Sequence, residues 1–266
     1  MKYLNIKLLI VFIILLVSCS KYKGDFRYIK ISTEKGDILL RLSNLTPKHR
    51  DNFIKLSSSK FYDNQIFHRV IQDFVIQGGD PSTKNAKPDS LYGEKDSGYL
   101  IDAEFNDSLF HTRGAIGMAR QGDDTNPEKK SSGSQFYIVK GKIYTDQQLD
   151  ELIIKKNNQF RNKLLRELIT KKLSSQPINK IDSVEVSLQA SIELDSIWES
   201  YPKFFLTPKQ RKLYTTIGGI PHLDRNYTVF GEVISGFEVV DMISASQTDK
   251  NDRPLKDIKF KVTVLK

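Results

Sequence analysis

Short runs in which apolar and polar residues alternate occupy most of the chain after residue 26, and this spacing constrains the fold more than any other feature. Apolar side chains at 28–31 and 38–42 flank the turn residues 34–36, which is typical of a β-hairpin. Thr46-Pro47 then has the form of an N-cap followed by proline at the first position of a short helix. Further short strands are expected at Ile66–Val70, Phe74–Gln77, Ala115–Ala119, Gln135–Val139, Thr228–Val233 and Ile258–Leu265. Because helices are few among them, we expect a mainly antiparallel β fold, either a barrel or a sandwich.

Residues 146–212 interrupt this pattern, because they contain no convincing strand. Thr145 and Gln148 have the spacing of a capping box, and the apolar residues that follow recur at three- and four-residue steps. Three helices are expected: a long amphipathic one after Thr145, one through Val186–Trp198, and one from Thr207-Pro208 to near Gly218. We interpret this segment as a helical insertion within the chain of the β domain.

The N-terminus carries an unbroken apolar run at Leu8–Val17, about half the length that a bilayer-spanning helix needs. Two lysines precede it, as in a signal peptide. Ser18 and Cys19 follow, and the sequence around the cysteine resembles the lipobox of bacterial lipoproteins. That resemblance implies a lipoprotein signal peptide at 1–18, lipidation of Cys19, and a tether at 19–25. The protein would then be anchored at the bacterial cell envelope, facing the periplasm or the exterior. The alternative is a short buried helix that contains an apolar thiol.

Charge and cysteine content exclude several classes of protein. The chain has 41 Lys and Arg against 32 Asp and Glu, a formal charge of +9, and the two signs are mixed along it. A solvated basic surface is favoured over a nucleic-acid groove. The single cysteine excludes an internal disulfide and a cysteine-based zinc site, and the four histidines lack metal-ligand spacing. We expect no metal, no cofactor and no nucleic-acid partner.

Three motifs carry the chemistry: Phe67–Pro81, then Gly114–Ala119 with Gly133–Ile138, then Pro221–Val233. In composition and order they resemble the signature blocks of cyclophilin-type peptidyl-prolyl isomerases. The resemblance covers residues 26–145 and 213–266. It implies a closed antiparallel eight-stranded β-barrel with capping helices, whose active site lies on the outside of the barrel.

The reaction needs neither a nucleophile nor a cofactor. Rotation about an Xaa-Pro amide has a barrier of about 18–20 kcal/mol, because resonance holds the bond planar. A fixed cation that donates a hydrogen bond to the prolyl nitrogen favours the twisted state. Arg69 is the residue expected to do this, since its guanidinium stays charged and presents donors in a rigid fork.

The remaining site residues follow from motif position. Gln77 is expected to anchor a substrate carbonyl, Arg120 to offer backbone groups beside Ala119, and Gln135 to lie nearby. The proline pocket is expected to be lined by Phe74, Val75, Tyr137, Leu223 and Tyr227. Phe136 should face the barrel core, since it alternates with Tyr137. His222 stands where many cyclophilins carry the indole associated with tight cyclosporin binding, so the resemblance does not extend to inhibitor sensitivity.

Two hypotheses follow from these observations. The first is an isomerase that speeds the folding of exported or envelope proteins by acting on proline-containing, unfolded or partly folded polypeptides. The alternative is a membrane-anchored, non-catalytic chaperone or scaffold that uses the barrel to bind peptides. The insertion is expected either to pack against the barrel as an elaboration or to serve as a client-binding arm.

Overall fold

The computed structural model describes residues 27–175 and 182–265. Cys19, the expected signal peptide and the tether lie outside the described residues, so their prediction is untested. The long strands are β1 (Arg27–Thr33), β2 (Gly36–Leu42), β10 (Val229–Ser235) and β11 (Lys259–Leu265). The short strands are β3 (Gln65–Ile66), β4 (Arg69–Val70), β5 (Val75–Gly78), β6 (Leu100–Ile101), β7 (Ala115–Met118), β8 (Ser131–Ser132) and β9 (Phe136–Val139). The helices are α2 (Pro47–Ser58), α3 (Asp146–Ser174), α4 (Ser183–Ser200), α5 (Pro208–Thr216) and α6 (Phe237–Ser244), with short 3-10 turns at Pro81–Asn85 and Pro221–Leu223.

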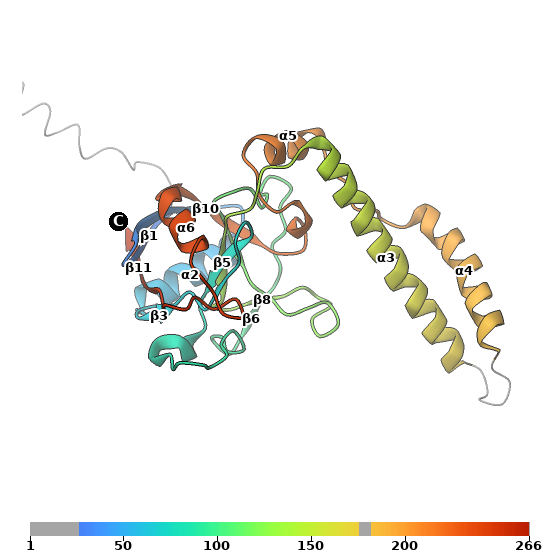
Figure 1. The fold of residues 1–266 in the computed structure, drawn as a ribbon, viewed down its shortest axis with the longest axis horizontal. Coiled ribbons are helices and arrows are strands. Elements are labelled where there is room, and N and C mark those ends of the chain that lie inside the picture. The colour runs from blue at the N-terminus through green and yellow to red at the C-terminus, as the bar shows by residue number, and fades with distance from the viewer. Residues whose placement is uncertain (1–26, 176–181, 266) are drawn as a thin grey trace, which may run out of the picture.

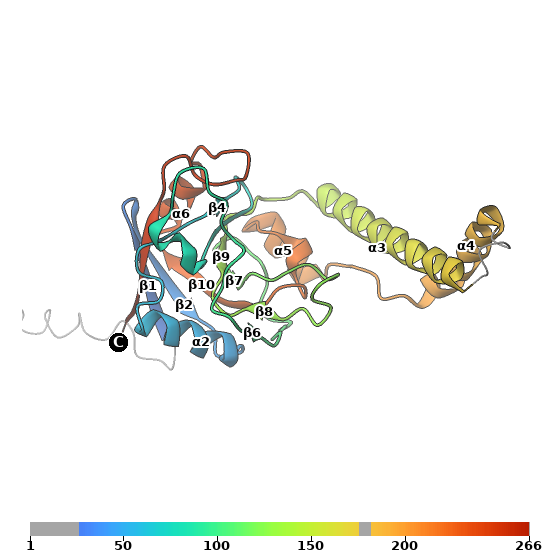
Figure 2. The same ribbon diagram turned by 90° about the horizontal axis from the view of Figure 1, so that it is seen from below.

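Nine strands form one antiparallel, strongly curled sheet in the order β3-β11-β1-β2-β10-β7-β9-β5-β4 (Figures 1 and 2). Its two edge strands, β3 and β4, are separated in the chain only by Phe67 and His68, so the sheet returns to its own starting point. The sequence resemblance implied eight strands. The count is nine because the run 65–70 is divided: β3 pairs with β11, whereas β4 pairs with β5.

The interior of the curled sheet is the main hydrophobic core. Alternate residues of β1 and β2 point into it, as the sequence pattern predicted, and Ile29, Ile31, Ile38 and Leu40 are fully buried. Phe136 is also fully buried there, packed edge-on against Phe53 of α2, which confirms its expected orientation. Helix α6 covers another part of the same core with Val239, Val240 and Ile243. The fold is therefore mainly β with capping helices, as expected.

Helix α2 begins where Thr46-Pro47 predicted, but the expected threonine cap is wrong. The Thr46 side chain makes no capping hydrogen bond. The free amides of the first turn donate instead to the carboxylate of Glu104, from Lys48 N at 3.1 Å and His49 N at 3.0 Å. The same carboxylate lies 2.6 Å from His49 Nδ1. A negative charge from a distant loop suits the positive end of the helix dipole better than a neutral hydroxyl does.

Helices α3 and α4 form an antiparallel pair that projects away from the barrel (Figures 1 and 2). Leu168, Ala190 and Leu194 are buried between the two helices. Nearer the barrel, Asn157 in α3 contacts Phe204, which lies in the segment after α4. The Asn157 side chain donates to Phe204 O (3.0 Å) and accepts from Phe204 N (2.8 Å). We call this pair of helices the arm. No helix in residues 27–175 and 182–265 combines the length and hydropathy needed to cross a bilayer.

Helix α5 returns from the arm to the barrel. Its Tyr214 is fully buried against Leu149 and Leu206, with Phe110 of the barrel beside them. Both α3 and α5 begin with capping boxes, at Thr145 and Thr207, where the sequence predicted helix starts. The division of the chain at 146 and 212 stays a prediction, although α5 is the part of that segment that packs on the barrel.

Candidate active site

One pocket of about 260 Å3 on the outside of the barrel brings together nine of the ten residues that the sequence placed in the site. It is lined by Arg69, Phe74, Val75, Gln77, Ala119, Arg120, Tyr137, Leu223 and Tyr227. Strand register explains much of this convergence, because Arg69 on β4 stands opposite Gln77 on β5, and Gln77 stands opposite Tyr137 on β9. Side chains in one such row share a face of the sheet.

A glycine makes room for the ring at the floor of this pocket. Gly117 on β7 is the next member of the row after Tyr137. A Cβ atom at Gly117 would lie 2.5 Å from the Tyr137 hydroxyl oxygen, which is closer than non-bonded atoms approach.

Arg69 is held by one hydrogen bond and one ion pair of its guanidinium. Its Nη1 donates to Gln77 Oε1 at 3.3 Å, and its Nε lies 3.5 Å from the Asp252 carboxylate. The Arg69 side chain is nevertheless 42% exposed, so N–H groups stay accessible from the pocket. A cation fixed before substrate arrives needs little reorganisation during the reaction.

Gln135 does not line the pocket but supports it from behind. The Gln77 amide donates to Gln135 Oε1 at 3.0 Å, and the Gln135 amide donates to the carbonyls of Gly93 and Lys95, each at 2.8 Å. These bonds fix which end of the Gln77 amide faces Arg69. Gln77 is thus a positioning residue in the unliganded protein, beyond its expected role of binding a substrate carbonyl.

The apolar wall of the pocket has a histidine packed behind it. His222 stacks on Phe74 with the ring planes 7° apart and the centroids 6.1 Å apart. Burial, with Lys156 nearby, lowers the pKa of His222 to about 4, so this ring is uncharged at neutral pH. Position 222 therefore supplies a neutral aromatic ring behind the pocket wall.

Arg120 also lines the pocket, but its guanidinium is committed to other groups. It lies 4.7 Å from the centroid of the Tyr227 ring, donates to Asn226 O at 2.6 Å, and pairs with Asp123 at 2.7 Å. Its side chain is only 4% exposed. Arg69 is consequently the better placed of the two arginines to donate to a substrate.

Behind the pocket floor lies a buried polar network that the sequence did not predict. The Tyr137 hydroxyl is 2.8 Å from His111 Nε2, and His111 Nδ1 is 2.9 Å from Asp224 Oδ1. The carboxylate also accepts from Tyr214 Oη (2.6 Å) and Gln210 Nε2 (3.0 Å), both on α5. Since Nδ1–H donates to Asp224, Nε2 accepts from the tyrosine, and burial keeps Tyr137 protonated by raising its pKa. The sequence held one signal of this network: Tyr137 places a hydroxyl in a pocket expected to be apolar, and a buried hydroxyl needs a hydrogen-bond partner.

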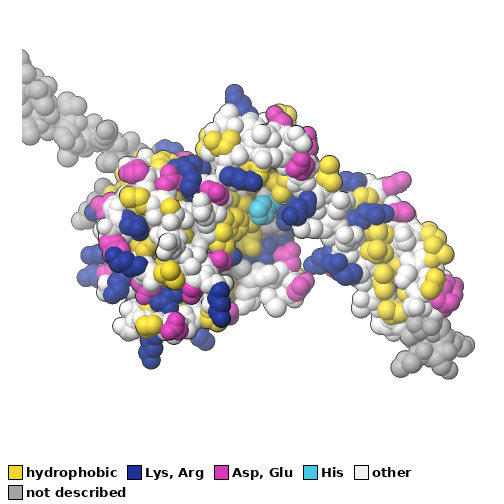
Figure 3. Space-filling model, viewed as in Figure 1, with side chains coloured by type: hydrophobic (Ala, Val, Ile, Leu, Met, Phe, Trp, Pro, Cys, Tyr) yellow, Lys and Arg dark blue, Asp and Glu magenta, His cyan; other side chains and the backbone are white. Residues whose placement is uncertain are grey.

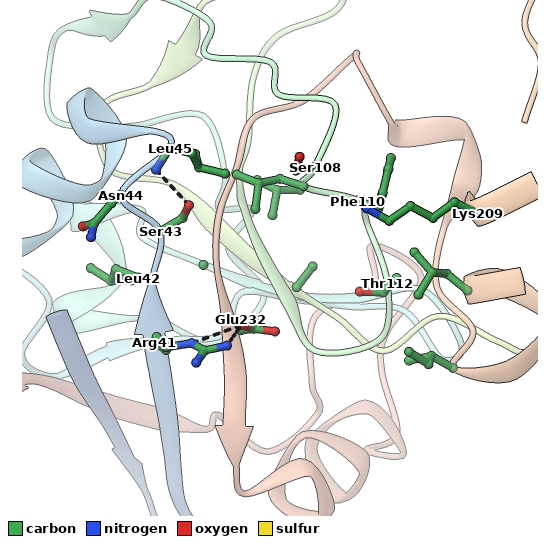
Figure 4. Close-up of a pocket in the computed structure, with 16 residues that line it drawn as sticks. Arg41, Leu42, Ser43, Asn44, Leu45, Ser108, Phe110, Thr112, Lys209 and Glu232 are labelled. Carbon is green, nitrogen blue, oxygen red and sulfur yellow. Dashed lines mark hydrogen bonds and ion pairs between the residues drawn. The ribbon is translucent and has the colours of Figure 1, made fainter. Parts of the chain in front are cut away.

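The pocket that holds the expected site residues is not the largest hollow in the described part of the chain. A larger hollow of about 590 Å3 lies between the end of β2, residues 108–112 and α5 (Figure 4). None of the expected site residues lines it, and the charged groups in its wall include the Arg41–Glu232 ion pair. Within residues 27–175 and 182–265 no cluster of three or more His, Cys, Asp or Glu side chains is arranged to hold a metal ion.

Comparison with known proteins agrees with this geometry. The family model described as cyclophilin type peptidyl-prolyl cis-trans isomerase/CLD matches residues 28–160 and 201–264. A Staphylococcus aureus (strain COL) protein with the provisional name peptidyl-prolyl cis-trans isomerase is 30% identical over 237 residues, which cover 89% of each chain. A Streptococcus pyogenes serotype M6 protein, provisionally named a bifunctional phosphatase/peptidyl-prolyl cis-trans isomerase, is 31% identical over 86% of this chain. The match spans only 37% of that longer protein.

Solved structures agree on the fold. The crystal structure of a cyclophilin type isomerase from Cryptosporidium parvum superposes with a TM-score of 0.53 and 23% identity, covering 91% of this chain and 98% of that one. The pocket, the motif order and these matches lead to one conclusion: the chain belongs to the cyclophilin-type peptidyl-prolyl cis-trans isomerase family.

Proposed function

We propose that this protein catalyses the cis–trans isomerisation of Xaa-Pro bonds in unfolded or partly folded polypeptides at the bacterial cell envelope. The observation that carries the proposal is the fixed, accessible Arg69 guanidinium beside a pocket of about 260 Å3 with an apolar wall. The related Cryptosporidium parvum isomerase has been crystallised in the presence of the dipeptide Ala-Pro, which supports proline as the recognised residue.

We expect the reaction to proceed without a covalent step. The prolyl ring enters between Phe74, Val75 and Leu223, and Arg69 donates a hydrogen bond to the prolyl nitrogen as the amide twists. The nitrogen lone pair is then held by Arg69 and no longer conjugates with the carbonyl. A rate gain on the order of 10⁵ needs about 7 kcal/mol, which a preorganised charged hydrogen bond and restraint of one side of the peptide together supply.

Replacing Arg69 tests this mechanism. Arg69→Ala should lower kcat/KM for a short Xaa-Pro peptide at least tenfold, about 1.4 kcal/mol, in a protease-coupled or NMR exchange assay. Arg166→Ala is the matched control, since Arg166 is an exposed arginine on the arm. Equal kcat/KM values for Arg69→Ala and the wild type would refute the proposed mechanism.

The envelope location rests on the sequence pattern at Cys19. The first residue of β1 is Arg27, eight residues further on, so an anchored chain would hold the barrel within about 29 Å of the membrane. The full-length precursor expressed in a bacterium should yield a mature protein whose first residue is acylated Cys19 and which sediments with membranes. Cys19→Ser should leave the protein unprocessed. An unmodified Cys19 in the wild type would refute the anchor.

A chaperone role is a second candidate, and one observation favours it. Val184, Leu188 and Ile192 recur at four-residue spacing on α4, and all three side chains are exposed. An apolar stripe of this kind suits weak contact with partly folded chains. The Arg69→Ala protein separates the two roles, because a chaperone would still suppress aggregation of a client after isomerase activity is lost.

A further inference from the structure

A further pocket, of about 300 Å3, lies where the arm meets the barrel. Its apolar lining includes Phe160 in the middle of α3, and Phe204 and Phe205 in the segment that returns from the arm. Its basic lining is Lys129, Lys203 and Arg225. We call this the arm pocket. The apolar side chains that Figure 3 shows gathered near the centre of the visible face surround a histidine, whereas no histidine is among the described residues that line the arm pocket.

The charge of the arm pocket is positive because its cations are poorly neutralised. Lys129 Nζ donates to the Asn226 side-chain oxygen (2.7 Å) and Lys203 Nζ to the Glu199 carbonyl (3.3 Å), and both acceptors are neutral. In the described part of the chain neither lysine has a carboxylate partner. Arg225 pairs with Asp107, but their side chains are 63% and 76% exposed, and such a surface pair is weak.

The carboxylate in the lining does not cancel this charge. Asp224 is 5% exposed, and it already accepts hydrogen bonds from His111, Gln210 and Tyr214. It is therefore turned away from solvent and committed to the network behind the proline pocket. The field inside the arm pocket favours an anionic group.

The arm pocket also offers apolar area that the protein leaves uncovered. Phe205 is 60% exposed, whereas its neighbour Phe204 packs against the Leu149, Leu206 and Tyr214 cluster and is fixed by Asn157. A large side chain docked on Phe205 would bury apolar surface beside the three cations. The combination suits a carboxylate accompanied by an aromatic or large aliphatic residue.

A short turn separates this pocket from the active site. Leu223 and Tyr227 face the proline pocket, whereas Arg225 and Asn226 line the arm pocket. The amides of Asn226 and Tyr227 both donate to Leu223 O, at 3.0 and 3.2 Å. Such a turn spans less than about 7 Å between the Cα atoms of its ends, roughly two residues of extended chain. Arg120 connects the two sides, since it lines the proline pocket and donates to Asn226 O.

We infer that the arm pocket is a second subsite for the same client chain, which takes an acidic residue together with a large apolar one about two to four residues from the bound proline. The inference rests on the proposed function and adds a substrate class to it. The arm would thereby give this isomerase a preference for acidic, aromatic-containing segments.

The test compares two ten-residue peptides, each with one Xaa-Pro bond. One carries a Glu-Phe-Glu cluster three residues from the proline and the other carries Lys-Phe-Lys, and each is made with the cluster on either side. Binding to the full mature chain is measured by NMR titration and turnover by exchange spectroscopy. The wild type should favour the acidic peptide about fivefold in Kd and in kcat/KM, and raised ionic strength should shrink the ratio.

Variants locate the effect. Lys129→Glu with Lys203→Glu should abolish or reverse the acidic-to-basic ratio, and Phe205→Ser should weaken both peptides alike. Lys171→Glu, on the distal part of α3, is the matched control and should leave the ratio unchanged. Equal affinity of the wild type for the two peptides, or a ratio that survives Lys129→Glu/Lys203→Glu, would overturn the subsite. Because Kd is measured independently of turnover, a protein that binds with preference but does not isomerise would refute the proposed function alone.

Discussion

Tyr137 shows how one hydroxyl changes what lies behind an otherwise apolar pocket. Tyr137→Phe should keep the ring in place but leave His111 Nε2 buried without a donor, at a cost of about 1–3 kcal/mol in unfolding free energy. The kcat/KM for a short peptide should stay within about threefold, because the pocket wall is unchanged. Urea unfolding and the isomerase assay measure the two effects. Tyr99→Phe, at an exposed hydroxyl, is the control, and equal stability losses in the two variants would contradict the network's importance.

His68, next to Arg69 in the sequence, predicts an acid-sensitive fold. Burial lowers its pKa to about 4, and among the described residues neither ring nitrogen has a hydrogen-bond partner. Between pH 6.5 and 4, His68 is therefore protonated in the unfolded chain but neutral in the folded chain. The stability linked to neutral His68 is fully present above pH 6.5 and is lost as pH falls toward 4, by about 3 kcal/mol.

Urea unfolding at pH 7 and pH 4 checks this prediction. His68→Gln should lose less stability over that interval than the wild type does, since the other titrating groups are common to both proteins. If the two proteins lost the same amount, the buried neutral histidine would not be the cause.

Site residues were predictable where they belong to one motif or one strand register. Arg69, Gln77 and Tyr137 stand in a row across three strands, so their convergence follows once the strands are paired. His111 and Asp224 were not predicted, because they are 113 residues apart and meet only in the folded chain. Nothing local in the sequence marks either residue as the partner of a tyrosine.

At the scale of elements, the start of α2 gives a paired prediction. Glu104→Ala should cost about 2–3 kcal/mol, because it removes the acceptor of two helix amides and leaves His49 without its carboxylate. Thr46→Val should change stability by less than about 0.5 kcal/mol or increase it, since the Thr46 hydroxyl is buried without a partner in the described chain. Chemical denaturation of both variants measures these losses. A larger loss of unfolding free energy in Thr46→Val than in Glu104→Ala would show that Thr46 caps the helix after all.

Helix starts were predictable when the capping group is local. Thr145 and Thr207 cap their helices through glutamines three residues later, and such pairs are visible in the sequence. The α2 cap comes from Glu104, 56 residues from the amide of Lys48 that it binds. A distant carboxylate can displace a local hydroxyl because its charge interacts with the helix dipole, and no short motif records that competition.

At the scale of the whole molecule, two deletions distinguish the arm from its base. Removing 161–200 with a short linker should leave short-peptide turnover within about twofold, since Asn157 and Phe204 already hold the two ends together. Removing 146–212 should lower the unfolding temperature further, because it also takes Gln210 from Asp224, and Leu149 and Leu206 from Tyr214. Thermal unfolding and the peptide assay compare the two. Equal stability of the two deletions would show that α5 adds nothing to the barrel.

The 161–200 deletion also tests for chaperone activity of the arm. If the exposed stripe on α4 binds clients, the 161–200 deletion should suppress aggregation of a refolding protein less well than the full chain does. If the deletion variant suppresses aggregation as well as the full chain, the arm does not bind clients through this stripe and only lines a subsite or stabilises the fold. The sequence predicted the helices of the arm, but it could not predict their direction, which depends on packing at the arm base.

The short edge strands of the barrel sheet have a consequence for the proposed action on unfolded chains. Exposed strand edges recruit extended polypeptides by backbone pairing, and such capture leads to co-aggregation. Here both edge strands, β3 and β4, are two residues long and belong to one continuous stretch of chain. If the protein acts on unfolded chains as proposed, a client segment would meet side-chain pockets from which it can dissociate, whereas an open sheet would retain it, and the enzyme would not co-aggregate with its substrate.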